Sequence, residues 1–326
     1  MKNPLTLAAL LALLHVGISA ADLRLGLIGL DTSHVIAFTK VYNDPKTPDH
    51  VPGGRVVAAF KGGSPDIPSS ATRIDGFTKQ LTETYGVKLY DSIEELARNV
   101  DAILIESVDG RPHLEQFKRT LAAKKPVFID KPLAGSLRDG LEIARLAREH
   151  GIPVFSSSSL RYGPEPLAPK LEKIGAVKSV YSVGPAEYEK SHPDLFWYGI
   201  HAVEALYTVM GPGCIRLVRT QTADADVVTG VWADGRVGTM QGNRNGYKGY
   251  GLTILGTKGA VTAGEKHSYR GLTLEIMKFF QTGVPPVPLD TTIEILAFME
   301  AADESKRRGG APVAIADVMK LAQAQK

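Results

Sequence analysis

The sequence has a single cysteine, few aromatic residues and no large excess of either positive or negative charge. Cys214 is the one cysteine among 326 residues, which excludes an intrachain disulfide and a cysteine-based zinc cluster. Basic residues number 38 against 35 acidic ones, and the short basic runs at 124–125 and 306–308 lie near the ends of expected helices. A basic side chain there offsets the helix dipole, so a nucleic-acid-binding patch is disfavoured.

Long apolar runs are also scarce, and the clearest one lies in the first residues. Residues 1–21 read MKNPLTLAALLALLHVGISAA, in which Lys2 precedes an apolar run over 5–16 that is followed by small residues. This run is too short to cross a bilayer and has the order of a secretory signal peptide. A membrane anchor is the alternative interpretation. We expect export to the periplasm or beyond, with no membrane association after the signal is removed.

Strand and helix patterns alternate regularly from residue 23 to about residue 160. Apolar runs predict strands over 23–30, 55–60, 87–90, 101–107, 126–130 and 153–159. Helices are expected over 33–44, 74–85, 92–99, 113–123 and 137–150. This order indicates an α/β domain at 22–160 in which helices cover both faces of a parallel sheet.

The second half has closely spaced strands instead. Strand-like runs lie at 177–184, 215–223, 226–233, 235–242, 250–257 and 259–264, and Asp234-Gly235 is a hairpin turn signal. Helices are expected over 196–210, 272–281 and 291–307. We therefore predict a second, α+β domain at 161–326 with a mostly antiparallel open sheet.

Several short motifs, in a fixed order, carry a family resemblance. They are GLIGL at 26–30, His113 after DAILIES, Asp130-Lys131-Pro132, Arg161-Tyr162, Gly199-Ile200-His201, LTILGTKGAV at 252–261 and ADESKRRGG at 302–310. Together they resemble the Gfo/Idh/MocA family, named for glucose–fructose oxidoreductase and inositol dehydrogenase. The resemblance implies a Rossmann domain for NAD or NADP, a second domain for a carbohydrate-like substrate, and a possible homo-oligomer through the open sheet.

The turn that should bind the nucleotide is altered. In a G-x-G-x-x-G turn the second glycine lets the diphosphate approach the backbone. Here Gly29 fills the first place, but Asp31 and His34 fill the second and third, and a carboxylate repels phosphate. Either a variant turn still binds NAD or NADP, or the Rossmann domain is a scaffold without it. The candidate cofactor-binding residues are Gly29, Asp31, Thr32, Ser33, His34, Lys61 and His113.

The substrate motifs are better preserved. The resemblance implies that Lys131 reaches a substrate hydroxyl and that His201 accepts its proton, so both are candidate catalytic residues; Asp130 replaces the family's glutamate. On a continuous helix, Trp197, His201 and Glu204 would share one face. Candidate substrate residues are Asp130, Arg161, Tyr162, His192, Trp197 and Glu204.

His192, Asp194, His201 and Glu204 are close enough in sequence to form a metal site. Acid–base chemistry is the favoured interpretation, and no metal is predicted.

Three functions remain open at this point. The leading hypothesis is an exported NAD(P)-dependent oxidoreductase that acts on a sugar, polyol or related carbohydrate. The first alternative is a nucleotide-free lyase, hydratase or epimerase that uses the same lysine and histidine on keto-sugars. The second is a non-catalytic sugar-binding protein. The fold alone does not separate the three.

Overall fold

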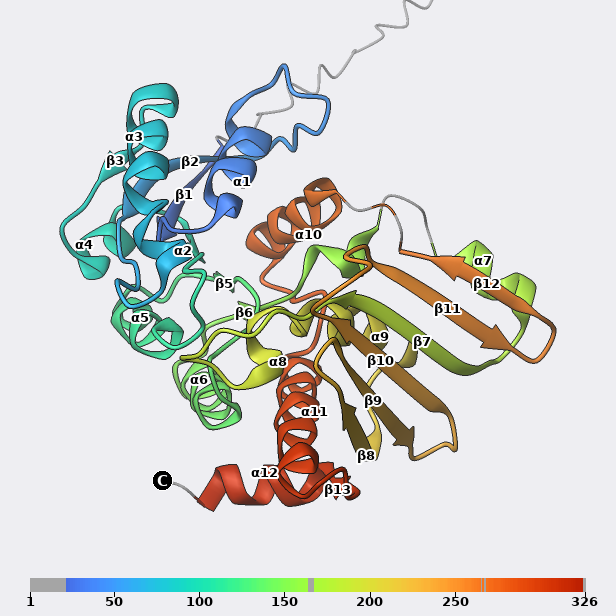
Figure 1. Ribbon diagram of the computed structural model, residues 1–326. Coiled ribbons are helices and arrows are strands. Elements are labelled where there is room, and N and C mark those ends of the chain that lie inside the picture. Colours follow the sequence, from blue (N-terminus) through green and yellow to red (C-terminus); the bar gives the residue numbers. More distant parts are fainter. Residues whose placement is uncertain (1–21, 164–166, 265, 267, 325–326) are drawn as a thin grey trace, which may run out of the picture.

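The computed structural model describes residues 22–163, 167–264, 266 and 268–324, so the signal-like segment at 1–21 lies outside the described residues. Two sheets lie side by side, each with its own helices (Figure 1). In the described part of the chain, no helix is both long and apolar enough to span a membrane.

The first sheet is parallel, as predicted. Its strands are β1 (Leu23–Ile28), β2 (Gly54–Phe60), β3 (Lys88–Leu89), β4 (Ala102–Ile105), β5 (Val127–Ile129) and β6 (Val154–Phe155). Their order is β3-β2-β1-β4-β5-β6, the Rossmann order with its reversal between β1 and β4. Ligands of such sheets bind at the carboxyl edge next to that reversal.

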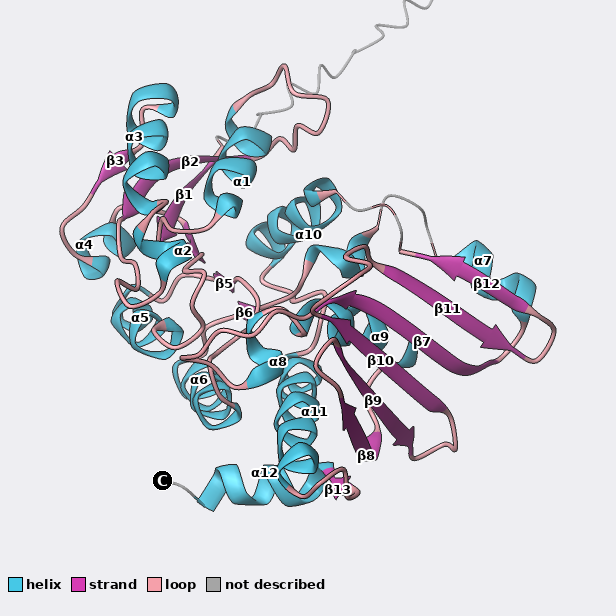
Figure 2. Ribbon diagram, viewed as in Figure 1, coloured by secondary structure: helices cyan, strands magenta, loops and turns pink. Residues whose placement is uncertain are grey.

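Helices cover both faces of this sheet (Figure 2). They are α1 (Ser33–Asn43), α2 (Pro68–Ala71), α3 (Ile74–Tyr85), α4 (Ile93–Arg98), α5 (His113–Thr120) and α6 (Leu137–His150). The strands are apolar on both sides: in β4, Leu104 faces the core of α1 and α3, whereas Ile103 and Ile105 face that of α4, α5 and α6. The continuous apolar runs of the sequence follow from this double burial.

The second sheet is mixed and mostly antiparallel, again as predicted. It contains β7 (Val177–Pro185), β8 (Cys214–Gln221), β9 (Ala225–Trp232), β10 (Val237–Asn243), β11 (Gly251–Gly256), β12 (Ala260–Ala263) and β13 (Val313–Ala314). The order is β12-β11-β7-β10-β9-β8-β13, and among these pairs β7 and β10 are parallel. The hairpin at Asp234-Gly235 joins β9 to β10, with Gly235 at a φ of 84°.

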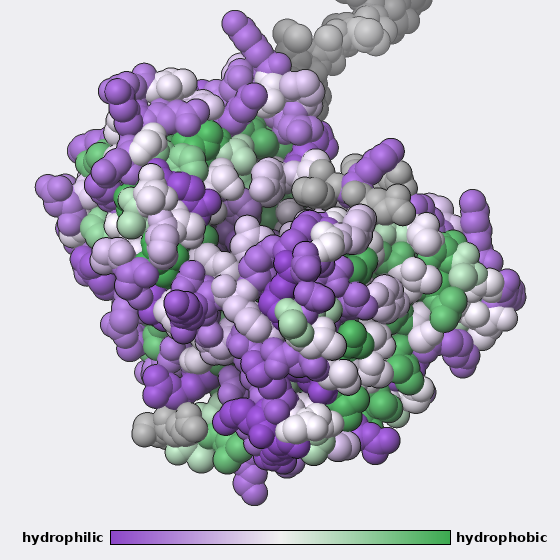
Figure 3. All heavy atoms as spheres, in the orientation of Figure 1, coloured by the Kyte–Doolittle hydropathy of each residue, from purple (hydrophilic) through white to green (hydrophobic). Residues whose placement is uncertain are grey.

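The remaining helices are α7 (Ala168–Ile174), α8 (Asp194–Trp197), α9 (Ile200–Met210), α10 (Tyr269–Thr282), α11 (Leu289–Arg307) and α12 (Ile315–Ala324). α9 packs on β7 and β10, and α11 packs on β8. The opposite face of the sheet exposes Tyr181, Val237 and Leu255, and apolar side chains gather over this sheet in Figure 3.

Two details differ from the expectation. The helix predicted over 196–210 is two helices, because Tyr198 leaves helical geometry after α8 and α9 begins at Ile200. In addition, α10 returns to the first domain, where Leu272 and Ile276 pack in the core that α1 shares with the sheet. The last third of the chain therefore completes the Rossmann core, a contact that local sequence patterns do not reveal.

Candidate functional site

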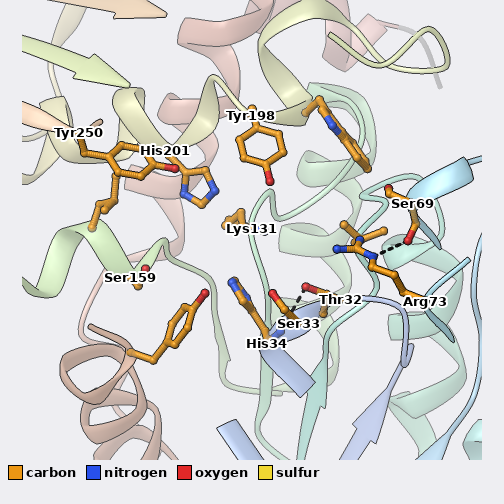
Figure 4. Close-up of a pocket in the computed structure, with 14 residues that line it drawn as sticks. Thr32, Ser33, His34, Ser69, Arg73, Lys131, Ser159, Tyr198, His201 and Tyr250 are labelled. Carbon is orange, nitrogen blue, oxygen red and sulfur yellow. Dashed lines mark hydrogen bonds between the residues drawn. The ribbon is translucent and has the colours of Figure 1, made fainter. Parts of the chain in front are cut away.

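A polar cavity of about 240 Å³ lies between the carboxyl edge of the first sheet and helices α8 and α9 (Figure 4). Its lining residues are Thr32, Ser33, His34, Ser69, Arg73, Val108, Lys131, Ser159, Leu160, Trp197, Tyr198, His201, Tyr250 and Tyr269. The two candidate catalytic residues, Lys131 and His201, thus share one cavity although 70 positions separate them in the sequence. The volume is below the usual range for drug-sized ligands and is suited to a single sugar-sized molecule.

One wall of the cavity is the turn between β1 and α1. Gly29 is required at the start of this turn, because its φ is 85° and a Cβ would lie 2.1 Å from Ser107 Oγ. Asp31, at the place of the second glycine, is fully buried. Its Oδ1 accepts a hydrogen bond of 2.9 Å from the amide of Val108, and its Oδ2 accepts one of 2.6 Å from Ser70 Oγ. The carboxylate is therefore bound by the protein's own donors.

The donor Ser70 lies in the short helix α2. This helix is part of the connection between β2 and α3, residues 61–73, which crosses the edge of the sheet and is called the 61–73 loop below. Gly62 lies against Gly29 at the end of β1, where a Cβ on Gly62 would be 3.2 Å from the Gly29 Cα. Beyond it, Ser64 Oγ donates to Asp109 Oδ2 at 2.7 Å in the loop that follows β4. The loop thus runs from the end of β2, past the end of β1, to the segment after β4.

Charged groups fasten the same loop. Arg111 donates to Asp66 at 2.8 Å and to Asp109 at 2.7 Å, and His192 Nε2 lies 2.9 Å from Asp109 Oδ1. Burial alone would raise the pKa of Asp109, but the hydrogen bonds from His192, Arg111 and Ser64 outweigh burial and hold that pKa below its usual range. Asp109 is therefore a charged anchor for the 61–73 loop.

The residues present do not fit a dinucleotide in this arrangement. In a Rossmann domain the coenzyme passes from the end of β2, over the amino end of α1, to the crevice between β1 and β4. The 61–73 loop takes this course, and Ser70 donates to the carboxylate that stands where the diphosphate needs a glycine. Lys61, expected near the ribose, instead forms an exposed ion pair of 2.6 Å with Asp75.

The other predicted cofactor-binding residues have varied surroundings. Thr32 caps α1, Ser33 lines the cavity, and His34 Nδ1 lies 2.7 Å from Asp130 Oδ2. His113 is fully buried and its ring nitrogens lie at 3.0 Å from the carbonyls of Pro132 and Ser107. Burial lowers the pKa of His113, which joins the segments after β4 and β5.

Lys131 follows β5 and is nine-tenths buried in the cavity wall. Its Nζ lies 3.4 Å from Asp130 Oδ2, and the peptide bond from Lys131 to Pro132 is cis. Burial alone would lower the pKa of Lys131, but the charge of Asp130, together with the smaller effects of Tyr198, Glu106 and Tyr269, outweighs burial and raises that pKa. The side chain is accordingly a cation that can donate a hydrogen bond to a substrate oxygen.

His201 stands on the opposite wall, in the first turn of α9. Its Nδ1 lies 2.8 Å from Ser158 Oγ, which orients the ring. The ring centroids of Tyr198 and Tyr250 lie 5.8 and 5.9 Å from that of His201. Figure 4 shows His201, Tyr198 and Tyr250 together on one side of the cavity and His34 and Ser33 across from them.

The predicted substrate residues are only partly gathered here. Trp197 lines the cavity, whereas Asp130 is fully buried behind Lys131. Arg161 donates to Glu204 at 2.6 Å, and Ser157 donates to the same carboxylate at 2.8 Å. Among the described residues that line the cavity are none of Arg161, Tyr162, His192 and Glu204.

The metal site weighed from the sequence does not form. His192 pairs with Asp109, Asp194 pairs with Arg219 and Lys306, and Glu204 pairs with Arg161. His201 and Glu204 do share α9, but the carboxylate of Glu204 accepts hydrogen bonds from Arg161 and Ser157. Three further residues near the cavity were not identified from the sequence: Glu106, Asp109 and Arg73. Glu106 directly follows β4, and Asp109 lies in the loop after it. Polar residues after a buried parallel strand are the signal that could have identified these two.

Comparisons with known proteins agree with this architecture. Residues 71–157 match the GFO_IDH_MocA family, described as an oxidoreductase family with an NAD-binding Rossmann fold. No functionally curated protein matches the chain.

Among solved structures, a probable dehydrogenase from Thermotoga maritima is 21% identical, with a TM-score of 0.71 over 91% of this chain and 100% of that one. A putative myo-inositol dehydrogenase from Sinorhizobium meliloti 1021 is 18% identical, with a TM-score of 0.70 over 90% and 99%. GenD2 from gentamicin A biosynthesis, solved in complex with NAD, is 19% identical, with a TM-score of 0.69 over 90% and 96%. The match over residues 71–157 and the shared two-domain fold thus agree with the resemblance of this chain to the Gfo/Idh/MocA oxidoreductase family.

Proposed function

We propose that this protein is a nucleotide-independent acid–base enzyme that moves a proton next to the carbonyl of a keto-sugar, with His201 and Lys131 as catalytic residues. The observation that carries the proposal is the 61–73 loop on the coenzyme's path, joined to Asp31 by Ser70, beside a cavity that holds both residues. On this proposal, Lys131 and His201 still act on the substrate, while the 61–73 loop occupies the place of the nucleotide.

The cavity is suited to one carbohydrate unit. Trp197, Tyr198 and Tyr250 offer aromatic faces that pack against the C–H face of a sugar ring. Ser33, Ser159 and Arg73 supply donors for hydroxyl groups. A small polar cavity with aromatic faces is suited to a small polar ring.

The proposed chemistry uses Lys131 and His201, which face the cavity from opposite walls. Lys131 Nζ donates a hydrogen bond to the carbonyl oxygen, which makes the neighbouring C–H more acidic and stabilises the enolate. His201, oriented by Ser158 at Nδ1, takes the proton at Nε2, and the electron pair of the C–H bond moves to the enolate oxygen. Delivery of a proton to the opposite face of the enolate gives an epimer. Loss of the hydroxyl on the next carbon, which takes up the proton and leaves as water, gives an eliminated product.

The test is exchange of hydrogen for deuterium. The mature protein is first shown to be free of nucleotide by absorbance and mass spectrometry, then incubated in D₂O with a panel of ketoses and keto-glycosides. Loss of the proton signal next to the carbonyl, without added nucleotide, is expected. Turnover that requires NAD or NADP would contradict the proposal, and saturable sugar binding without any exchange would favour the sugar-binding alternative.

The second candidate is the family activity, NAD(P)-dependent oxidation of a sugar or polyol. The match to an NAD-binding family and the likeness to GenD2, solved with NAD, favour it. This activity requires the 61–73 loop to leave the edge of the sheet, which breaks the Ser70–Asp31 and Asp66–Arg111 contacts. Saturable binding of NADH or NADPH would support this candidate over the first.

Export stays part of the proposal, because it rests on the signal-like residues 1–21. N-terminal sequencing of protein recovered from the periplasm tests it: cleavage near Ala20 supports export, and an intact Met1 argues against it. A homo-oligomer through the open face that exposes Tyr181 and Leu255 likewise stays a prediction, for which the measured mass in solution is the test.

A further inference from the structure

Three potential metal ligands converge behind the cavity wall, from three separate elements. Glu106 follows β4, Asp130 follows β5, and His34 lies in the first turn of α1. One ligand atom from each lies within 4.8 Å of the other two. Glu106 and Asp130 are fully buried and His34 is 8% exposed, so this cluster is held by the core of the domain.

The oxygens of this cluster are poorly satisfied. Both carboxylate oxygens of Glu106, and Oδ1 of Asp130, have no hydrogen-bond partner among the described residues. Buried polar atoms are nearly always paired, and an unpaired buried carboxylate costs several kcal/mol or takes up a proton or a cation. The Asp130 atom that does have partners, Oδ2, lies 2.7 Å from His34 Nδ1 and 3.4 Å from Lys131 Nζ.

We propose that His34, Glu106 and Asp130 bind one divalent transition-metal ion. Two carboxylates and one imidazole match the donors that Mn²⁺, Fe²⁺ and Zn²⁺ accept, and three protein ligands leave a coordination position for water or substrate. A divalent cation offsets the charge of the two buried carboxylates, of which Asp130 is also paired with the cation of Lys131. The unpaired oxygens of Glu106 then have a partner.

The metal would lie immediately behind the substrate. His34 belongs to the cluster, Lys131 contacts it through Asp130, and both residues line the cavity. A cation there would polarise the same carbonyl oxygen that Lys131 contacts, as a Lewis acid. This role rests on the proposed function, whereas the metal site itself does not.

The test measures binding of the metal alone. Full-length mature protein is stripped with a chelator and then titrated with Mn²⁺ and, separately, Zn²⁺, with bound metal counted by mass spectrometry after desalting. The wild type is expected to hold one equivalent and to gain thermal stability with it. Glu106→Gln, which keeps the side chain's shape but removes its charge, should weaken binding by more than the ~10–100-fold that loss of an outer-shell partner costs.

Two further variants make the result interpretable. His34→Gln should weaken binding as well, and Glu300→Gln, a partly buried acid on α11 far from the cluster, should bind as the wild type does. Circular dichroism of the stripped proteins shows whether each variant folds.

Equal binding by the wild type and Glu106→Gln would overturn the proposal. So would a wild type that holds no metal at millimolar concentration. Neither result bears on the deuterium exchange.

Discussion

The two walls of the cavity use polar side chains differently. On the wall formed by the β1–α1 turn, Asp31 is buried and both of its oxygens bind groups of the protein itself. On the wall formed by α9, His201 is oriented by Ser158 while its ring lines the cavity. The polar group of the first wall is bound by the protein itself, whereas the second wall presents an oriented imidazole to the cavity.

On the proposed function, this difference is how one fold dispenses with a nucleotide and retains an acid–base site. The carboxyl edge of the parallel sheet still positions Lys131, because that position depends on β5 and not on a bound nucleotide. The space that a dinucleotide would need is filled by residues 61–73, whose polar groups are paired with Asp31, Asp109 and Arg111. Removing a ligand from such an edge requires that its hydrogen bonds be replaced.

The largest expected effect lies on the reactive wall. His201→Ala should slow deuterium exchange by about 10²–10⁴-fold, the range for loss of a general base, and Lys131→Ala should slow it by a similar factor. His150→Ala, an exposed histidine at the end of α6, serves as the matched control. Full exchange in either cavity variant would show that the wall is not reactive.

On the structural wall, the expected effect is on stability. Asp31→Asn keeps the size of the side chain but weakens two buried hydrogen bonds, so urea unfolding should show a loss of about 1–3 kcal/mol. Asp75→Asn removes an exposed ion pair with Lys61 and should change stability by less than about 1 kcal/mol. If the two variants were equally stable, Asp31 would not secure the 61–73 loop.

A pH series sharpens the same contrast. Because the pKa of Asp109 is lowered in the folded protein, its contribution to stability is present above the unfolded value of about 3.9 and is lost as pH falls toward the folded value. Asp109→Asn should therefore be less stable than the wild type at pH 6, with a difference that shrinks toward pH 3. A difference independent of pH, measured by urea unfolding, would contradict this.

The smallest effect concerns the aromatic lining. Trp197→Ala should weaken binding of a sugar ligand by about 2–10-fold, which corresponds to the loss of one aromatic contact. Isothermal calorimetry measures this, with the exposed Tyr247→Ala as control. Unchanged affinity would place the ring of the substrate elsewhere in the cavity.

Much of this fold could be predicted from the sequence. Doubly buried strands such as β1 and β4 carry continuous apolar runs, and the change to closely spaced strands marks the second sheet. The sequence also predicted an altered turn from Asp31 and His34. These features are local, so periodicity and spacing reveal them.

The missed features depend on contacts between distant residues. The fold of the 61–73 loop depends on Ser70 and Asp31, which are 39 positions apart, and nothing in its glycines and serines predicts that pairing. Glu106 was included in the strand predicted over 101–107, and the two potential ligands that lie near it, His34 and Asp130, are on α1 and after β5. The break between α8 and α9 also escaped, although Gly199 directly after Tyr198 is a signal that could have identified it.

Titration of the mature protein with NADH and NADPH, followed by calorimetry and by nicotinamide fluorescence, tests the central claim most directly. With the 61–73 loop in place, we expect no saturable binding of either coenzyme up to millimolar concentration, in the same protein that exchanges deuterium into a keto-sugar. Stoichiometric binding at micromolar concentration would contradict the account, since the loop would then have to yield its place to the coenzyme.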